Sequence, residues 1–494
     1  MAANKLPTTS WIYDLEVYPN MFEASFIPYG VPQDIIDLYI AADIAKNKED
    51  KRLILEAMGA KTFIIYRAYH EDKFERQNMT PVSWDDSNNI SSGIEGLYMF
   101  FKSHKIIIGY NSFNCDMTML DIFIHYAPTF DWKTGLREDT YGRTQHITEF
   151  LFEHSQKAVD KDIGNKTYRR LLDFYKGRRY FRPFTDFDIQ KILYLDATFV
   201  ALKAVMIVLK WYRIQDLPIH WSYRIKRDEI ALVTDYNIND VLGTDALVKN
   251  QQKELDLRAK LSEIYAIDLR NMSRSSIGKN LMTKFYSEWS GMPPYEFVDL
   301  RTERSAVPIG KVVKDSIQFK TPFYRKILES IQKYSIYIGL GSPKQSELKR
   351  ESIANGIVVT TWRKSFQSLE FLSHDKGYTI AKGGLHSKDD PRVIWAESGE
   401  ILADPDVNSM YPSFIVEYGV SPHHLSSKVF LGIVEWLRTT RLDAKHSGRK
   451  LEADALKIVI NRIYGAFNDA MDYLYDPECT YTVTINLQLL LCNL

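Results

Sequence analysis

The stretch WIYDLEVYPN, residues 11–20, predicts a strand of a mixed α/β domain. Its aromatic and β-branched residues are typical of strands, and Asp14 and Glu16 lie two positions apart within it. Because side chains alternate across a strand, both carboxylates point to one face. Neighbouring carboxylates repel unless a cation joins them, and Mg²⁺ or Mn²⁺ prefers such oxygen ligands. A solvated acidic face on an edge strand would give the same pattern, so other segments must decide.

Two further stretches supply the partners that a metal site needs. In HKIIIGYNSFNCDMTML, residues 104–120, a strand is followed by a polar turn with Asn111, and a helix begins near Asp116. An aspartate at a helix start is commonly only a cap.

The other stretch, EIALVTDYNINDVLGTDAL (residues 229–247), has a helical pattern. It places Tyr236 and Asp240 four positions apart, on one face of the helix. Together the three stretches offer four carboxylates and a phenol, which suffice for a two-metal site with an oriented water.

The ordered patterns D-x-E, N-x4-D and Y-x3-D resemble the three exonuclease motifs of family B DNA polymerases. In that family, four carboxylates bind two metal ions that cleave the 3′-terminal phosphodiester. The resemblance assigns metal ligation and catalysis to four residues here: Asp14, Glu16, Asp116 and Asp240. It also implies that Tyr236 positions the attacking water and that Asn111 contacts the end of the primer.

Three other features of this region bear on the resemblance. Cys115 stands where an aromatic residue commonly precedes the aspartate, so we expect altered packing beside the metal more than altered ligation. Lys203 falls where related phage enzymes often carry a lysine near the scissile phosphate; an exposed helix lysine is the alternative. The segment FYKGRRYFR, residues 174–182, either grips single-stranded DNA through phosphates and stacking or is a solvated loop.

The stretch ILADPDVNSMYPSFI, residues 401–415, resembles polymerase motif A of the same family. The resemblance implies that Asp406 is catalytic and holds the metal that activates the primer 3′-hydroxyl. It implies that Tyr411 packs under the incoming sugar and selects deoxyribonucleotides. Met410 replaces the usual leucine, a volume-conserving change. The alternative is a Tyr-Pro-Ser corner that merely ends a strand.

The stretch ALKIVINRIYGAFND, residues 455–469, resembles motif B of the polymerase fingers. Its spacing places three nucleotide-binding candidates on one helical stripe: Lys457, Asn461 and Tyr464. Gly465 lets the template base come close. Arg462 stands where serine is frequent, and we expect it to face solvent.

Two further segments are assigned by the same resemblance. Arg441 and Lys445, four apart in EWLRTTRLDAKH, lie where the other fingers helix carries basic residues against the phosphates; a solvated helix face is the alternative. Gly383 and Gly384 in YTIAKGGLHS resemble a template-binding Y-x-G-G loop, with Ala381 at the tyrosine position. The glycines either allow close approach of a phosphate or form a turn.

The composition sets broader limits. A chain of 494 residues with 45% hydrophobic and 26% charged residues predicts a soluble protein of two to four domains. The sequence contains no apolar run of membrane-spanning length and no secretory signal, so we expect a cytoplasmic protein, in a bacterial host if it is phage-encoded. Three unpaired cysteines argue against disulfides or structural zinc. The balance of 63 basic and 63 acidic residues requires any DNA groove to arise from local charge clusters.

These observations predict a mixed α/β chain: a ribonuclease H-like exonuclease domain followed by a partial palm and helical fingers. The predicted divisions are an exonuclease domain (1–250), a connecting and N-terminal palm region (251–395), palm with motif A (396–425), fingers with motif B (426–470) and a return toward the palm (471–494). Residues 250–395 are expected to be mostly helix and polar connection, with VPIGKVV and NGIVVTTWRKS as short strands. Residues 396–420 are expected to form a strand followed by the start of a helix, and residues 426–470 two helices separated by the turn KHSGRK.

Motif C, which supplies the second polymerase aspartate in this family, is not found before Leu494. We therefore expect exonuclease activity but poor synthesis from this chain alone, with a second polypeptide supplying motif C and the thumb. The expected cofactors are two Mg²⁺ or Mn²⁺ ions per active site, and the expected partners are primed DNA and deoxynucleotides. Motifs A and B are too close for a protein-priming insertion. A stand-alone 3′–5′ exonuclease or an inactive DNA-binding fragment is the alternative.

Overall fold

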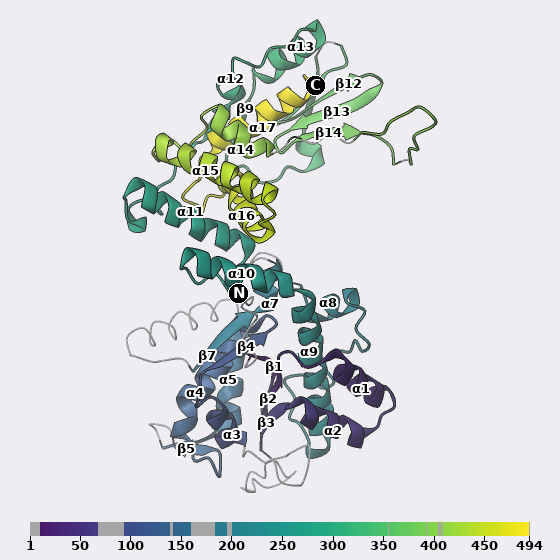
Figure 1. The fold of residues 1–494 in the computed structure, drawn as a ribbon, viewed down its shortest axis with the longest axis vertical. Coiled ribbons are helices and arrows are strands. Elements are labelled where there is room, and N and C mark those ends of the chain that lie inside the picture. Colours follow the sequence, from purple (N-terminus) through teal and green to yellow (C-terminus); the bar gives the residue numbers. More distant parts are fainter. Residues whose placement is uncertain are drawn as a thin grey trace. The chain divides into compact units, whose positions relative to one another are not determined.

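The computed structural model of the chain forms two compact units, Met1–Arg274 (unit 1) and Ser275–Leu494 (unit 2) (Figure 1). Each unit combines helices and strands, which confirms the mixed α/β class. The five-part division expected from the sequence stays a prediction. The structure describes residues 10–67, 93–138, 142–159, 183–194, 200–353, 355–391, 393–403, 407 and 409–493.

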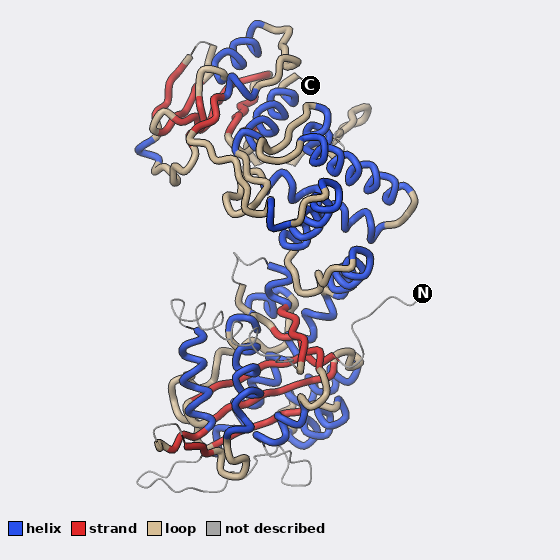
Figure 2. The backbone as a smooth tube through the Cα atoms, turned by 90° about the vertical axis from the view of Figure 1, so that its left-hand side faces the viewer, coloured by secondary structure: helices blue, strands red, loops and turns tan. Residues whose placement is uncertain are grey.

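Unit 1 contains a five-stranded sheet whose order is β3-β2-β1-β4-β7. Figure 2 draws the strands in red. The central strand β1 pairs antiparallel with β2 and parallel with β4, and β4 pairs parallel with β7. The strands are β1 (Ser10–Tyr18), β2 (Met21–Pro28), β3 (Lys61–Tyr66), β4 (Lys105–Gly109) and β7 (Phe184–Asp188); β5 (Leu136–Glu138) and β6 (Thr144–His146) form a separate pair. The strand predicted at WIYDLEVY is confirmed as β1, and the structure places it at the centre of this sheet.

Helices cover both faces of the unit 1 sheet (Figure 1). One face packs against α3 (Gly93–Phe100), α4 (Asp116–Tyr126) and α5 (Ile147–Val159). The other packs against α1 (Gln33–Ile44), α2 (Lys48–Met58), α7 (Ile189–Tyr194), α8 (Leu202–Val208), α9 (Ile230–Asn250) and α10 (Gln252–Tyr265). These two apolar layers hold the sheet rigidly between them.

The alternation of β1 decides which side chains meet which layer. Tyr13 and Leu15 belong to the core beneath α3, α4 and α5, whereas Ile12 belongs to the core on the α9 side. Asp14 and Glu16 share the parity of Ile12, and so they face α9. The predicted placement of both carboxylates on one strand face is confirmed.

Unit 2 contains a seven-stranded sheet that the sequence largely failed to predict. Its strands are β8 (Ala306–Pro308), β9 (Ser335–Tyr337), β10 (Lys349–Ser352), β11 (Val358–Trp362), β12 (Ser365–Ser373), β13 (Lys376–Ala381) and β14 (Leu385–Lys388). Of the two strands expected in this region, β11 matches NGIVVTTWRKS. The strand predicted at VPIGKVV was wrong beyond Pro308, where the chain forms α12 (Ile309–Val312). The buried residues Ile309 and Val312 are three positions apart, which is the spacing of one helix face.

The helices of unit 2 carry most of the polymerase-like motifs. They are α11 (Arg274–Ser290), α13 (Pro322–Ile331), α14 (Met410–Glu417), α15 (Ser427–His446), α16 (Lys450–Ala466) and α17 (Pro477–Leu491). The predicted pair of helices across the turn KHSGRK is confirmed by α15 and α16. Among the described residues of 396–409 there is no strand, so the strand expected before α14 is not formed there. No helix in the described part of the chain combines the length and the apolar character needed to cross a membrane.

Candidate active site

The structure brings together in unit 1 the four carboxylates that the sequence singled out. Asp14 and Glu16 come from β1, Asp116 begins α4, and Asp240 lies in α9, which packs against β1. Their charges interact, because Asp116, Glu16 and Asp240 each raise the pKa of Asp14. Asp240 is buried, and the other three keep part of their surface exposed.

Burial and mutual repulsion act in the same direction on this group. Burial raises the pKa values of Asp14 and Glu16 well above the usual range. Nearby carboxylates raise both pKa values further. The pKa of Asp116 is also raised well above its usual value, first by burial and then by Asp186 and Asp188. The concentration of negative charge is therefore unfavourable unless protons or cations neutralise it.

Tyr236 and Lys203 complete the surroundings of Asp240. Burial raises the pKa of Asp240 to about 6, while the Tyr236 hydroxyl, which donates a hydrogen bond to it, and the charge of Lys203 act to lower it. The Lys203 ammonium lies 5.9 Å from the centre of the Tyr236 ring and 2.8 Å from Asp216 Oδ1. Lys203 therefore lies near Tyr236 and Asp240 and pairs with Asp216, and its predicted role stays a prediction.

Asn237 is a neighbour of the carboxylates that the sequence reading missed. Its side chain is fully buried, and Nδ2 donates to Asp14 Oδ2 at 3.0 Å. It also forms a hydrogen bond with Glu16, which lowers the pKa of that carboxyl. Among the described residues, the buried Asn237 Oδ1 has no hydrogen-bond partner. One amide therefore holds both β1 carboxylates, and its position directly after Tyr236 was the available signal.

Glu23 is a fifth carboxyl group that was also missed. It lies on β2 directly opposite Glu16 and is fully buried, accepting hydrogen bonds from Thr234 Oγ1 at 2.9 Å and Ser25 Oγ at 3.3 Å. Burial raises its pKa to about 8. Glu23 is thus mainly protonated at neutral pH, and only its cross-strand pairing could have linked it to Glu16.

The donor set in unit 1 fits a hard divalent cation by its chemistry. The described part of the chain contains no group of three or more His, Cys, Asp and Glu side chains already arranged to hold a metal ion. The four carboxylates nevertheless provide oxygen ligands, and a cation among them would relieve the repulsion that raises their pKa values. Asp14, Glu16, Asp116 and Asp240 are the residues that would hold it.

The turn between β4 and α4 contains the remaining predicted residues of unit 1. Asn111 has a left-handed backbone, with φ 58° and ψ 23°, and its N–H donates to Asp188. Cys115 is packed partly against the hydrophobic core, and burial followed by the nearby carboxylates raises its pKa. The expected effect of Cys115 on packing stays a prediction.

In unit 2 the structure brings residues of the stretches 401–415 and 455–469 into contact. The rings of Tyr411 on α14 and Tyr464 on α16 lie 4.5 Å apart between centroids, with an interplanar angle of 35°. Lys457 and Asn461 are exposed on the stripe of α16 that contains Tyr464. The predicted metal residue Asp406 lies outside the described residues, as does the segment 174–182.

The basic residues of α15 divide between the helix interface and solvent. Arg441 Nη1 donates to Ser409 Oγ at 3.0 Å, and Arg438 Nη1 donates to Ser413 Oγ at 3.2 Å, so both reach the start of α14. Lys445 is exposed. Arg441 therefore lies close to the start of α14. Lys445 follows Arg441 by one turn of α15.

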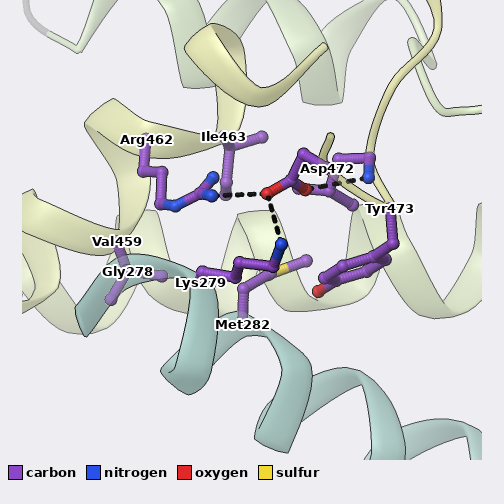
Figure 3. A pocket seen from close by; sticks show the side chains of 9 residues that line it. Gly278, Lys279, Met282, Val459, Arg462, Ile463, Asp472 and Tyr473 are labelled. Carbon is purple, nitrogen blue, oxygen red and sulfur yellow. Dashed lines mark hydrogen bonds and ion pairs between the residues drawn. The ribbon is translucent and has the colours of Figure 1, made fainter. Parts of the chain in front are cut away.

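The expectation that Arg462 faces solvent was wrong. Its guanidinium forms an ion pair with the fully buried Asp472, and its Nε donates to Ser275 O at 2.6 Å (Figure 3). Lys279 Nζ lies 3.7 Å from the same Asp472 oxygen. Two cations thus surround one buried carboxylate, which attaches α16 to α11.

The two predicted DNA-binding glycines lie in the turn between β13 and β14. A Cβ added at Gly383 would meet no atom within 4 Å, and at Gly384 only the His386 ring at 3.5 Å. The turn is held to α17, because Gln488 exchanges two hydrogen bonds with the backbone of Ala381. A Cβ at Gly465 would likewise meet nothing within 4 Å. Packing within this chain therefore does not explain these glycines.

Comparison of the chain with protein-family models and with curated proteins finds no match. Its function must therefore be argued from the arrangement of its own residues.

Proposed function

We propose that unit 1 is a metal-dependent 3′–5′ exonuclease and that the chain is part of a family B DNA polymerase. The observation that carries the proposal is the meeting of Asp14, Glu16, Asp116 and Asp240, from three separate elements, beside Tyr236. Structural ion-pair networks usually pair acids with bases, whereas these acids mostly face one another. An excess of buried negative charge in one place is typical of a functional site.

The residues of unit 1 have separate roles in this proposal. Bound Mg²⁺ or Mn²⁺ would supply a nucleophilic water and stabilise charge on the phosphate. Tyr236, whose hydroxyl is held by Asp240, orients the attacking water. Lys203 supports the negative charge of the scissile phosphate, and Asn111 contacts the last nucleotide. Asn237 fixes the two carboxylates of β1.

For unit 2 we propose a deoxynucleotide-binding surface around α14, α15 and α16. The contact between Tyr411 and Tyr464 supports it, because one ring would then support the sugar while the other meets the base pair. Arg441 and the exposed residues Lys445 and Lys457 would contact the triphosphate. In this proposal Asp406 holds the metal for synthesis, and Gly383 and Gly384 approach the template backbone.

The arm formed by residues 393–402 supports the proposal of a second polypeptide. Its large apolar side chains are exposed: Val393, Ile394, Trp395, Ile401 and Leu402, with Trp395 79% exposed and Ile401 90% exposed. A β-turn joins the two halves, with Glu400 N–H donating to Glu397 O at 2.9 Å. Large apolar side chains that are exposed so near one another in the sequence favour an interaction surface. The proposed polypeptide would cover these apolar side chains.

The test is a denaturing gel of a 5′-labelled primed template incubated with the purified chain and Mg²⁺, with and without the four deoxynucleotides. We expect shortening that Asp14→Ala/Glu16→Ala abolishes. The matched control, Asp34→Ala/Asp37→Ala, removes the same charge from the exposed face of α1 and should retain the activity.

Each outcome of the gel has a definite meaning. Shortening without extension supports the exonuclease and shows no synthesis by this chain alone. Extension would show that the chain completes a polymerase site itself. Binding to DNA without shortening would overturn the nuclease proposal and leave the DNA-binding fragment.

A further inference from the structure

Strand β7 contains two buried aspartates that the proposed chemistry does not use. Asp186 is 4% exposed and Asp188 is 1% exposed. In the parallel pairing of β4 with β7, Asp188 lies opposite Gly109, the last residue of β4. Both aspartates are therefore placed beside the turn that leads from β4 to Asp116.

The carboxylate of Asp188 fixes the backbone of this turn. Its Oδ1 accepts hydrogen bonds from the N–H groups of Asn111 at 3.0 Å and Lys191 at 3.2 Å, and its Oδ2 accepts one from Phe113 at 3.1 Å. Asn111 is in the left-handed region, which costs energy for a residue other than glycine. The hydrogen bonds of Asp188 offset that cost and hold the turn in this shape.

The carboxylate of Asp186 joins the same turn to β1. Its Oδ1 accepts from the Tyr13 hydroxyl at 2.9 Å, and its Oδ2 accepts from Ser112 Oγ at 2.8 Å. Tyr13 directly precedes Asp14, so one carboxylate connects the two segments that contribute Asp14 and Asp116.

Two further contacts make this arrangement rigid. Asn271 Nδ2 donates to Asp186 O at 2.7 Å, and Asp188 N–H donates to Asn271 Oδ1 at 3.1 Å, which fixes the backbone of β7. At Gly109, a Cβ would lie 2.8 Å from Ser112 Cβ and 2.9 Å from Tyr13 Cε1. The turn therefore packs against β1 more closely than any larger residue at Gly109 would allow.

We propose that Asp186 and Asp188 are positioning residues that hold the Asn111–Asp116 turn against β1 and so set the distance between Asp116 and Asp14. The inference rests on the proposed exonuclease function. All four carboxylate oxygens of Asp186 and Asp188 already accept N–H or O–H groups, and these donors lie in β1, in the turn and at the start of α7. These contacts assign the β7 aspartates to positioning rather than to metal ligation.

The test compares Asp188→Asn with Asp245→Asn in the full chain. Asparagine keeps the size of the side chain, but its NH₂ group would face at least one of the backbone N–H donors. We expect the Mn²⁺ concentration for half-maximal exonuclease rate to rise about tenfold or more, as for other residues that orient metal ligands. Asp245 is a matched control because its side chain is 1% exposed and pairs with Lys249 within the same unit. Asp245→Asn should leave the Mn²⁺ dependence unchanged.

Hydrogen exchange of the peptide covering residues 109–116 gives a second readout that needs no activity. Asp188→Asn should accelerate exchange there about tenfold or more, as expected when hydrogen bonds that close a turn are lost. A peptide from β3 should be unaffected. If Asp188→Asn fails to fold, Tyr13→Phe, which removes one donor to Asp186, should raise the half-saturating Mn²⁺ concentration about threefold.

The outcomes separate the inference from the function on which it rests. If the wild type shows no metal-dependent cleavage, the proposed function is refuted. The positioning role is then tested by hydrogen exchange of residues 109–116 alone, compared between the wild type and Asp188→Asn. An active Asp188→Asn with wild-type Mn²⁺ dependence would overturn the inference and leave the exonuclease standing. Unchanged exchange in the turn would overturn the inference in either case.

Discussion

Replacing Glu23 by Gln should make the folding stability of unit 1 less sensitive to pH. Burial raises the pKa of Glu23 from its usual 4.5 to about 8 in the folded chain. A carboxyl group with a raised folded pKa stabilises the fold fully below its unfolded pKa, and this contribution is lost as pH rises through the folded pKa. The relevant window therefore runs from about pH 4.5 to pH 8.

The size of the effect follows from the two pKa values of Glu23. At about 1.4 kcal/mol per unit, the full shift corresponds to roughly 5 kcal/mol, and the part lost between pH 5 and pH 8 is on the order of 3 kcal/mol. Gln cannot ionise, and its amide oxygen still accepts from Thr234. Between pH 5 and pH 8 the wild type should therefore lose about 3 kcal/mol of unfolding free energy that Glu23→Gln does not lose.

Urea unfolding at the two pH values measures this difference, with pulsed hydrogen exchange of β1 and β2 peptides reporting on unit 1. Glu95→Gln is the control, because Glu95 is an exposed glutamate on α3 of the same unit. It should follow the wild type at both pH values. A stability difference between Glu23→Gln and wild type that stays constant from pH 5 to pH 8 would refute the reasoning.

Three other substitutions test separate parts of the structure. Asp472→Ala should destabilise unit 2 by about 3 kcal/mol in urea unfolding, because it leaves the Arg462 guanidinium buried without its partner; a loss below about 1 kcal/mol would contradict this. Asn237→Ala should slow exonuclease cleavage about 10- to 100-fold with an unchanged circular dichroism spectrum, and wild-type rates would show that Asp14 and Glu16 need no such support. Val393→Glu/Ile401→Glu should keep the wild-type melting temperature and bind less of a hydrophobic dye; a lowered melting temperature would mean that the arm is packed.

The core of unit 1 was predictable because its signals are local. The alternation in WIYDLEVYPN reports directly which residues of β1 face each layer, and the spacing of Tyr236 and Asp240 reports a helix face. These patterns depend only on residues that are close in the sequence, within about two helical turns. Sequence reading therefore located both carboxylates of β1 and their partner on α9.

The supporting residues were missed because their partners are distant in sequence. Glu23 matters through its cross-strand neighbour Glu16, and Asp188 matters through the backbone of Asn111, 77 positions away. The strand FTDFD, residues 184–188, has an alternation like that around Asp14. Its meaning depends on which strand lies beside it, and pairing is not visible in a single strand.

The sheet of unit 2 shows the same limit. In β12, the stretch SFQSLEFLS mixes buried and half-buried residues without strict alternation, and the register between β11 and β12 shifts at Thr360/Thr361. A bulge of this kind disturbs the period-two pattern on which strand prediction depends. The helices α15 and α16 were predicted because each keeps a long apolar stripe of its own.

The most direct test of the central claim, that four carboxylates of unit 1 share divalent cations, is Mn²⁺ binding followed by electron paramagnetic resonance. The titration uses the full chain with a single-stranded oligonucleotide, beside Asp14→Ala/Glu16→Ala and the control Asp34→Ala/Asp37→Ala. Wild type and control should bind two Mn²⁺ ions that the Asp14→Ala/Glu16→Ala variant fails to bind. Equal Mn²⁺ binding by the wild type and the Asp14→Ala/Glu16→Ala variant would contradict the claim.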